Sequence, residues 1–498
     1  MDAVVDVINA IDAWVWGIPM LVLLLGSHIF LTFRTGVIQR KLPVAIKLSV
    51  SKDPNAPGDI SQFGALCTAL SATIGTGNIV GVGTAIIAGG PGAVLWMWLT
   101  GVFGIATKYA ETFAAVKYRV KDHNGNMLGG AMYAWKRAFK NKDGKTPWWA
   151  ELGAGLFAIF AAIAAFGIGA AVQTQAVTSV VTTNVSAIPD WIGSFLDWIN
   201  VDHTDGVGIL PEAIIGLIIV GLVAAVIFGG VKAISRVCEK LVPFMAFAYA
   251  IGCIIILVIN WAYIWPAICL IVECAFTPRA AFGGAVGSGL MLALQFGCAR
   301  GLFSNESGLG SAPIVASAAS TRNPARQALV SMTGTFWDTV VVCALTGLVL
   351  VSTMIGNADL QAELMVGNIT AGAELTSAAF GEIPIIGTPI LVVGMILFAY
   401  STTLGWSYYG NRCITFLFGK KAIKPYQVLY LIIAFLGAIG VGDVVWTVSD
   451  ITNALMAVPN IIVVLLLSGV IARETKHYVY SGNLDEQDCE PIPQLEAK

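Results

Sequence analysis

Two hydrophobic stretches of this sequence carry glycine with serine, threonine and asparagine where an ordinary membrane helix would carry leucine or valine. The first runs Ser71-Ala-Thr-Ile-Gly-Thr-Gly-Asn-Ile-Val-Gly-Val-Gly83. The second runs Gly297-Cys-Ala-Arg-Gly-Leu-Phe-Ser-Asn-Glu-Ser-Gly-Leu-Gly-Ser-Ala-Pro313. In a bilayer, a helix interruption is tolerated only where protein groups or a cavity satisfy the freed backbone. Close helix packing through small residues is the alternative, but it must account for two such stretches in corresponding halves of the chain.

The chemistry open to such a break is the binding of a zwitterion together with a metal cation. Where a helix unwinds and restarts, its free N–H groups and the positive end of its dipole face an anion. The unwound carbonyls and nearby hydroxyls face a cation. An amino acid offers one charge of each sign, and a coupled Na⁺ takes further oxygen ligands. Matched breaks in two halves of a chain are the best sequence pointer to the central site of a transporter.

The rest of the sequence is typical of an integral membrane protein. Of its 498 residues, 57% are hydrophobic and 12% are charged, and the mean hydropathy is +0.79. Soluble domains carry about 25% charged residues. The acidic start of the chain is unlike a cleaved signal peptide, so we expect the first hydrophobic stretch to be retained. Hydropathy and turn signals predict about eleven transmembrane helices, at 13–34, 60–88, 92–119, 150–184, 210–230, 239–262, 284–316, 328–355, 384–417, 425–442 and 449–472.

Basic residues alternate between the segments that connect these helices. One set of segments holds 25 of the 28 Lys and Arg residues, at 34–52, 117–145, 232–240, 322–326, 412–424 and in the C-terminal tail. In the other set, 185–209 and 356–383 carry acidic residues and no Lys or Arg, and Arg279 is the exception. An excess of Lys and Arg marks the cytoplasmic side. This pattern predicts a multi-pass protein of the plasma membrane (the inner membrane of a prokaryote), with the N-terminus outside and the C-terminus in the cytoplasm. The basic stretch 37–52 is either an amphipathic helix on the inner surface or a solvated loop.

At its glycine-rich stretches the sequence resembles the alanine or glycine:cation symporter family, also called sodium:alanine symporters. In addition, Gly89-Gly-Pro-Gly-Ala-Val-Leu-Trp-Met-Trp-Leu-Thr-Gly-Val-Phe-Gly104 is similar to the family's diagnostic signature, with Leu95 where phenylalanine is expected. The resemblance covers roughly residues 10–475. It implies an all-α membrane fold like that of the bacterial leucine transporter, a 5+5 inverted repeat with one extra N-terminal helix and a broken helix first in each repeat.

The resemblance also implies how the chain divides into segments. The expected order is an extra N-terminal transmembrane helix, a cytoplasmic basic linker, a first five-helix repeat, an extracytoplasmic loop, a second five-helix repeat and a cytoplasmic tail. Their bounds are 1–36, 37–58, 59–262, 263–283, 284–472 and 473–498.

The function implied is secondary active symport, not an enzymatic reaction. The expected substrate is a small neutral amino acid, alanine or glycine, taken up with Na⁺ by alternating access. A proton-coupled transporter of the same fold is one alternative, and a passive channel, which would need rings of selectivity groups, is another. The sequence shows no Ser-His-Asp arrangement, phosphate-binding loop or nucleic-acid patch. The expected partners are therefore the amino acid and membrane lipid, without an obligatory protein partner.

By the same resemblance, the substrate lies between the two broken helices. The amides of Thr76 and Gly77, within the break Gly75-Thr76-Gly77-Asn78, would bind its carboxylate. Carbonyls and a side chain of the second break would meet its amine. Apart from the resemblance, Gln173 and Gln175 interrupt an alanine-rich run, and residues two apart do not share a helix face. One of them, taken here as Gln173, would line the pathway, and the other would form a hydrogen bond between helices. The predicted substrate-binding set is Thr73, Gly75, Thr76, Gly77, Asn78, Gln173, Phe303, Ser304 and Glu306.

The resemblance implies a sodium site through the stretch Ala399-Tyr-Ser-Thr-Thr403, which matches the pattern Ala-x-x-Thr-Ser/Thr of this fold. The implied ligands are Ser71, Ile74, Ala399, Thr402 and Thr403. Five uncharged oxygens suit a hard cation that must also leave.

A second ion site would draw on Thr73, Asn78, Ser304 and a residue of the next helix. That residue is Asp338, where the fold leads one to expect a neutral amide. A carboxylate within a membrane is a functional candidate by default. It leaves a proton open as coupling ion, and equally a structural role or an ion pair with a base such as Arg300.

Overall fold

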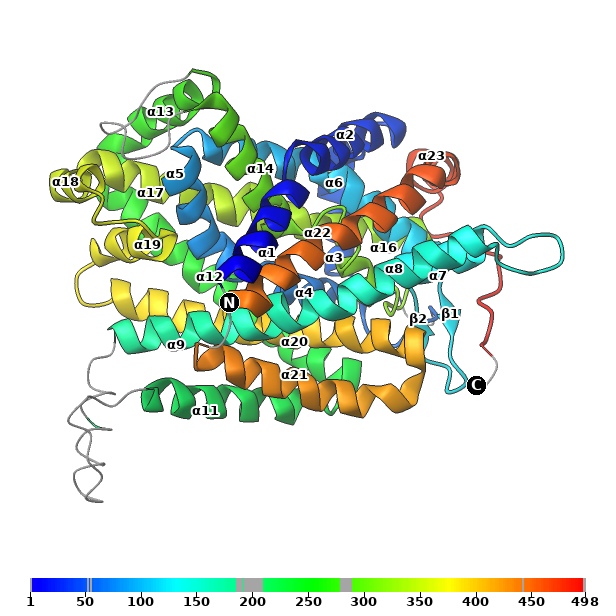
Figure 1. The fold of residues 1–498 in the computed structure, drawn as a ribbon. Coiled ribbons are helices and arrows are strands. Elements are labelled where there is room, and N and C mark those ends of the chain that lie inside the picture. The colour runs from blue at the N-terminus through cyan, green and yellow to red at the C-terminus, as the bar shows by residue number, and fades with distance from the viewer. Residues whose placement is uncertain are drawn as a thin grey trace, which may run out of the picture.

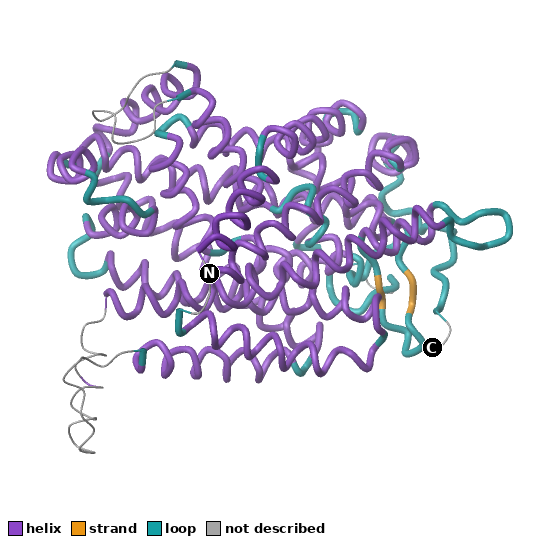
Figure 2. The backbone as a smooth tube through the Cα atoms, in the orientation of Figure 1, coloured by secondary structure: helices purple, strands orange, loops and turns teal. Residues whose placement is uncertain are grey.

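The computed structural model describes residues 2–51, 53, 56–184, 191, 209–277, 289–440 and 443–495 (Figure 1). Nearly all of the acidic segment 185–209 lies outside these residues, as do Lys52, Arg279 and Lys498. Helices make up most of the described chain (Figure 2). Within it there is one small antiparallel sheet, formed by β1 (Val120–Lys121) and β2 (Met127–Leu128).

The first half of the chain contains a helix that is broken near its middle. The break lies between α4 and α5, which are joined by the π-helical turn η2 (Gly77–Gly81) and inclined at 52°. A second π-helical turn, η3 (Ala165–Ala171), joins α8 to α9 without interrupting the long helix. The helices of this half are α1 (Asp2–Val15), α2 (Ile18–Arg34), α3 (Leu42–Ser49), α4 (Gln62–Thr73), α5 (Val82–Gly89), α6 (Ala93–Lys117), α7 (Ala131–Ala138), α8 (Trp148–Ala164), α9 (Val172–Asn184), α11 (Leu210–Ile227) and α12 (Gly230–Ile259).

The second half contains the other break, between α14 and α15. The π-helical turn η6 (Phe336–Cys343) joins α16 to α17, and another, η8 (Lys476–Tyr480), extends α23. The helices of this half are α13 (Ile264–Phe276), α14 (Leu290–Asn305), α15 (Ala312–Ala316), α16 (Pro324–Thr335), α17 (Ala344–Gly356), α18 (Ala358–Val366), α19 (Gly372–Gly381), α20 (Gly387–Phe418), α21 (Ile423–Ala438), α22 (Asp443–Leu466) and α23 (Ser468–Thr475). Short 3₁₀ turns are η1 (Ile38–Lys41), η4 (Trp261–Tyr263) and η7 (Lys420–Ala422).

Two segments between the predicted spans contain helices. The basic stretch 37–52, expected to be either an amphipathic helix or a loop, contains α3, which turns by 64° from α2 and packs against α16. The segment 263–283, expected to be a loop, contains α13, because its residues from Ile264 to Phe276 are mostly apolar. The chain is already helical at Asp2, well before the predicted start at residue 13.

Length and composition identify six helical runs that could cross a membrane, or up to eight if α2–α3 and α4–α5 each count as one bent span, within the described residues. The predicted number of eleven therefore stays a prediction. Two of the other predicted spans correspond to helices of 16 residues, α14 and α21, which is short for a crossing. A third, α6, carries charged residues near its middle.

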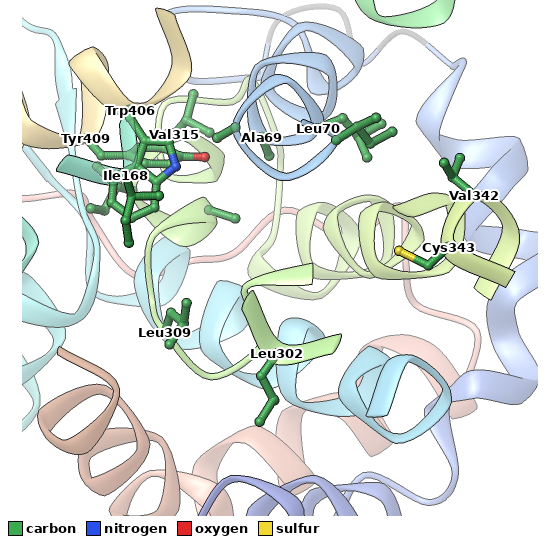
Figure 3. Packing of buried hydrophobic residues seen from close by; sticks show 14 of the residues in the cluster. Ala69, Leu70, Ile168, Leu302, Leu309, Val315, Val342, Cys343, Trp406 and Tyr409 are labelled. Atoms are coloured by element: carbon green, nitrogen blue, oxygen red, sulfur yellow. The ribbon is translucent and has the colours of Figure 1, made fainter. Parts of the chain in front are cut away.

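The helix α20 forms the centre of the packing and contacts α4, α8, α9 and α12. Its side chains Trp406 and Tyr409 lie beside Ile168 of η3 (Figure 3), and Trp406 packs directly on Gly169. On the other side of the break, α14 packs against α5 and α6. Large apolar side chains such as Phe33, Phe228 and Phe247 are exposed on the outside, as expected for a surface that faces lipid. The two breaks lie inside this shell.

Candidate functional site

The first break satisfies its backbone largely with its own side chains. Helix α4 ends at Thr73, and Ile74 adopts an extended conformation. The N–H of Gly75 donates to Oδ1 of Asn78 at 2.9 Å. Asn78 stands three residues further along the same segment, so the amide side chain replaces the backbone carbonyl that a continuous helix would supply.

The carboxylate of Asp338 joins the two broken helices. Asn78 Nδ2 donates to Asp338 Oδ1 at 2.7 Å, and Ser304 Oγ of α14 donates to Oδ2 at 2.9 Å. Thr339 Oγ1 donates to the same Oδ2 at 2.7 Å. All four side chains are buried. Three donors on one carboxylate form a charge-assisted network, which is the arrangement of a carboxylate that holds the breaks in place.

Arg300, the base that the sequence suggested as a partner of Asp338, points elsewhere. Its guanidinium lies 5.8 Å from the centre of the Phe303 ring. It interacts electrostatically with Asp12 of α1 and with Asp450 of α22. Lys108 of α6 is the buried cation that interacts electrostatically with the carboxylate of Asp338.

The second break depends on charged side chains from other helices. Helix α14 ends at Asn305, and Glu306 takes a left-handed conformation with φ of 53°. Lys108 Nζ donates to the carbonyl of Glu306 at 2.9 Å and lies 3.1 Å from a carboxylate oxygen of Glu111. Glu111 in turn accepts the N–H of Gly308 at 3.1 Å. The freed carbonyl and N–H groups of this break are therefore bonded to a buried ion pair of α6.

Two more polar side chains complete this support. Asn460 Nδ2 of α22 donates both to Glu111 Oε2 and to the carbonyl of Gly308, each at 2.9 Å. Ser311 Oγ donates to the carboxylate of Glu306. Lys108, Glu111 and Asn460 are not among the residues predicted from the sequence. The signal that could have found the first two is a lysine and a glutamate three residues apart inside an otherwise apolar span, which mark one helix face.

A small cavity lies between the two breaks. Seven of the nine predicted substrate-binding residues line it, namely Thr73, Gly75, Thr76, Gly77, Gln173, Phe303 and Glu306. Ala72, Ile168 and Thr402 complete the lining. The remaining two predicted residues, Asn78 and Ser304, instead bond to Asp338. The structure thus brings together side chains from α4, η3, α9, α14 and α20.

Two oxygens in this cavity have no hydrogen-bond partner in the described structure. They are Oε1 of Gln173 and Oγ1 of Thr402, and both side chains are 2% exposed. Both face the same backbone position, because a Cβ added at Gly75 would lie 2.6 Å from Thr402 Oγ1 and 3.8 Å from Gln173 Oε1. Buried polar atoms nearly always have partners. The pair therefore suits a polar ligand held next to Gly75.

The predicted sodium residues lie where α4 and α20 meet. Ser401 Oγ lies 3.5 Å from the carbonyl of Ser71, which fixes how close the two helices are. Thr403 Oγ1 donates to the carbonyl of Ala399 at 2.9 Å. That bond uses the hydroxyl proton and leaves oxygen lone pairs. The neighbouring Thr402 instead points its hydroxyl into the cavity, so one of the five expected ligands is shared with the substrate region.

Comparisons with known proteins identify the family and the fold of this chain. The sequence model of the sodium:alanine symporter family matches residues 1–490. The sodium/alanine symporter AgcS of Methanococcus maripaludis is 47% identical over 95% of this chain and 97% of its own. The probable sodium/glutamine symporter GlnT of Bacillus subtilis is 31% identical over 93% and 88%. Among solved structures, that of MhsT in complex with L-phenylalanine superposes with a TM-score of 0.55 at 14% identity, over 86% of this chain and 95% of MhsT. This last similarity concerns the fold alone, and it confirms the leucine-transporter-like fold expected from the sequence.

Proposed function

Because the chain belongs to the sodium:alanine symporter family, we propose that it takes up a small neutral amino acid, alanine or glycine, together with Na⁺ by alternating access. The family makes the chain a multi-pass membrane transporter for sodium-coupled amino-acid symport and not an enzyme. The proposal adds the substrate, the transport cycle and the residues that carry them.

The observation that carries the proposal is the cavity between the two breaks. The amides of Thr76 and Gly77 begin η2, where the free N–H groups and the dipole favour a carboxylate. Gln173 Oε1 offers an oxygen without a partner near Gly75, as an ammonium requires, and Thr402 Oγ1 next to it is left for the coupling ion. Phe303 and Ile168 close the cavity with apolar surface. The cavity has a volume of only about 10 Å³ in this conformation, which favours a small side chain on the substrate.

The coupling ion proposed is Na⁺, held by the carbonyls of Ser71, Ile74 and Ala399 with the hydroxyls of Thr402 and Thr403. The contact of α4 with α20 supports the site, since an ion there would link the first break to an intact helix. The carboxylates of Asp338 and Glu306 keep H⁺ as the alternative. Asp338 is fully bonded to protein donors, which favours a structural role for it over that of a second ion ligand.

Uptake into liposomes tests the proposal. Purified protein would be reconstituted and given radiolabelled alanine, glycine, glutamine or phenylalanine under an inward gradient of Na⁺, Li⁺ or H⁺. We expect concentrative uptake of alanine or glycine that collapses without the Na⁺ gradient. Uptake driven by H⁺ alone would replace Na⁺ with a proton as the coupling ion. Equilibration without accumulation under every gradient would identify a channel and contradict the proposal.

We propose that the N-terminus lies outside and the C-terminus in the cytoplasm, because Lys and Arg are concentrated in one set of connecting segments. Single cysteines would be labelled with a membrane-impermeant maleimide in intact cells, with the exposed native Cys269 and Cys489 replaced by serine. A cysteine at Asp202 should be labelled from outside, and one at the exposed Lys140 should be spared. The opposite pattern would invert the topology. Asp202 lies outside the described residues.

A further inference from the structure

The C-terminal tail, residues 481–495, lies across one end of the molecule, near β1 and β2 (Figure 1). It bonds to two loops that are far apart in sequence. Lys121 exchanges backbone hydrogen bonds with Pro493 and Leu495, at 2.8 and 2.7 Å. The N–H of Asp488 donates to the carbonyl of Arg322 at 2.8 Å. Between the tail and these loops lies a cavity of about 460 Å³, which we call the tail cavity.

The lining of the tail cavity is strongly basic. Five cationic and two acidic side chains line it, which gives a formal charge of +3. They are Lys117, Arg119, Lys121, Arg137 and Arg322, with Asp488 and Glu490. Glu474 and Asp53, which pair with Lys117 and Arg322 from outside the lining, reduce this excess. The positive charge that remains attracts anions into the cavity.

Two of these cations have carboxylate partners. Lys117 Nζ lies 3.2–3.3 Å from oxygens of Glu474, Asp488 and Glu490. Arg322 pairs with Asp53, and this hydrogen bond raises the pKa of the guanidinium. The acidic residues of the lining are therefore engaged by Lys117.

Arg119 is buried without such a partner. It is 4% exposed, and its guanidinium donates to four backbone carbonyls, those of Pro57, Ser317, Ala319 and Thr321, at 2.8–3.3 Å. Carbonyls satisfy N–H groups but do not neutralise a charge. No carboxylate of the described chain lies within ion-pair distance of Arg119. Burial accordingly lowers its pKa to about 10, although Asp59 and Asp488 oppose this from a distance.

Arg137, beside Arg119, also bonds to a backbone carbonyl and to no carboxylate of the described residues. One of its N–H groups donates to the carbonyl of Arg119 at 2.8 Å, and its guanidinium lies 6.0 Å from the centre of the Tyr118 ring. Burial lowers the pKa of Arg137, with Glu490 opposing the shift. Like Arg119, it forms no ion pair within the described residues. The tendency of cytoplasmic loops to be basic accounts for the presence of arginines here. It does not account for the burial of Arg119 without an anion, which is costly, next to the half-buried Arg137.

We propose that the tail cavity binds a phosphate group, with Arg137 and Lys121 as its hydrogen-bond donors and the buried charge of Arg119 beside them. Guanidinium groups bind phosphate oxygens with paired, charge-assisted hydrogen bonds, and a bound phosphate would supply the missing counter-charge. The group could belong to a soluble phosphate compound or to the headgroup of an anionic lipid, because both carry the same chemistry. This site is independent of the proposed substrate cavity.

The test measures thermal stability and binding of the full-length protein. In nanodiscs of phosphatidylcholine, inorganic phosphate would be titrated at constant ionic strength against chloride. In a second arm, nanodiscs containing phosphatidylglycerol would replace them. Saturable stabilisation by inorganic phosphate identifies a soluble ligand, whereas protection by phosphatidylglycerol alone identifies a lipid headgroup. No effect in either arm would overturn the proposal.

Substitutions inside and outside the cavity distinguish specific binding of phosphate from its general electrostatic effect on a basic surface. Arg137→Gln should weaken the apparent affinity by about tenfold or more, the effect of losing a charged hydrogen bond. Lys121→Gln, whose ammonium makes no contact in the described structure, should also weaken it and provides a second variant if Arg137→Gln folds poorly. The matched control is Lys136→Gln, because this neighbouring lysine lies over the Phe416 ring and outside the cavity. Equal effects of all three substitutions would contradict a defined site.

Discussion

The two helix breaks of this protein differ in where their freed backbone groups find partners. In the first, the N–H of Gly75 is bonded to Asn78 of the same segment. In the second, the carbonyl of Glu306 and the N–H of Gly308 are bonded to Lys108 and Glu111 of α6. The freed N–H of the first break is thus bonded to a neutral amide of the same segment, whereas the freed groups of the second are bonded to a buried ion pair from another helix.

This difference indicates that the two breaks have different energetic roles. A buried ion pair contributes little net stability when it is intact, but removing one partner leaves an uncompensated charge. The second break is therefore the more sensitive to mutation of its support. The first break borders the unpartnered oxygens of Gln173 and Thr402, so its variants should act on ligands more than on folding.

The largest effect expected is that of Lys108→Met. The substitution leaves the carboxylate of Glu111 buried without its cation, since the side chains of the pair are 2% and 0% exposed. We expect the free energy of unfolding to fall by about 3–5 kcal/mol. Denaturant unfolding of the purified protein in detergent would measure it, with Lys136→Met as control. A loss below about 1 kcal/mol, the range of exposed pairs, would refute the assigned role of the ion pair.

Asp338→Asn should have the next largest effect. An amide offers one acceptor oxygen where the carboxylate receives donors from Asn78, Ser304 and Thr339. We expect a loss of about 1–3 kcal/mol in stability, and a fall in transport of more than tenfold at saturating Na⁺. If Asp338→Asn instead transports normally but loses dependence on pH, Asp338 carries a proton and does not merely hold the breaks together.

Gly77→Leu should abolish substrate binding and leave a folded protein. A Cβ at this position would lie 3.4 Å from the Phe303 ring, an ordinary contact, so Gly77→Ala should keep part of the binding. The longer side chain of leucine would enter the space where the carboxylate meets the amides. Binding of labelled alanine to purified protein measures the effect. Gly221→Leu, at a position with open space around it, is the control. Near-normal binding by Gly77→Leu would show that the carboxylate lies elsewhere.

Thr403→Val should change the stability of the protein least, but it should selectively weaken the binding of Na⁺. Removing one ligand oxygen should raise half-saturating Na⁺ by about 5- to 150-fold, and lower alanine affinity only at subsaturating Na⁺. The alternative is that Thr403 serves only its hydrogen bond to Ala399 within α20. In that case stability or yield would change while the Na⁺ dependence of uptake stays as in wild type. Thr415→Val, which removes a hydroxyl bonded to the carbonyl of Asn411 four residues earlier in the same helix, is the matched control.

The sequence alone determined the class of this protein and the position of both breaks. Glycine-rich polar stretches in an apolar chain are typical of interrupted membrane helices, and Gly75-Thr76-Gly77-Asn78 carries within four residues both the break and the side chain that satisfies it. Such patterns depend on residues that are close together in the chain, so they can be predicted from the sequence. The same holds for most helix positions, although helix ends and the helix α13 were not foreseen, and for α3 a helix was only one of two expectations.

Only the tertiary structure decided which distant side chains complete the site. Lys108 and Glu111 meet residues about 200 positions away, and Asn460 comes from still further along the chain. The structure also decided that Thr402 faces the cavity while Thr403 bonds within its own helix, although the two are adjacent in sequence. The physical reason is that a side chain's partners depend on the rotation and packing of whole helices, which hydropathy and spacing leave undetermined.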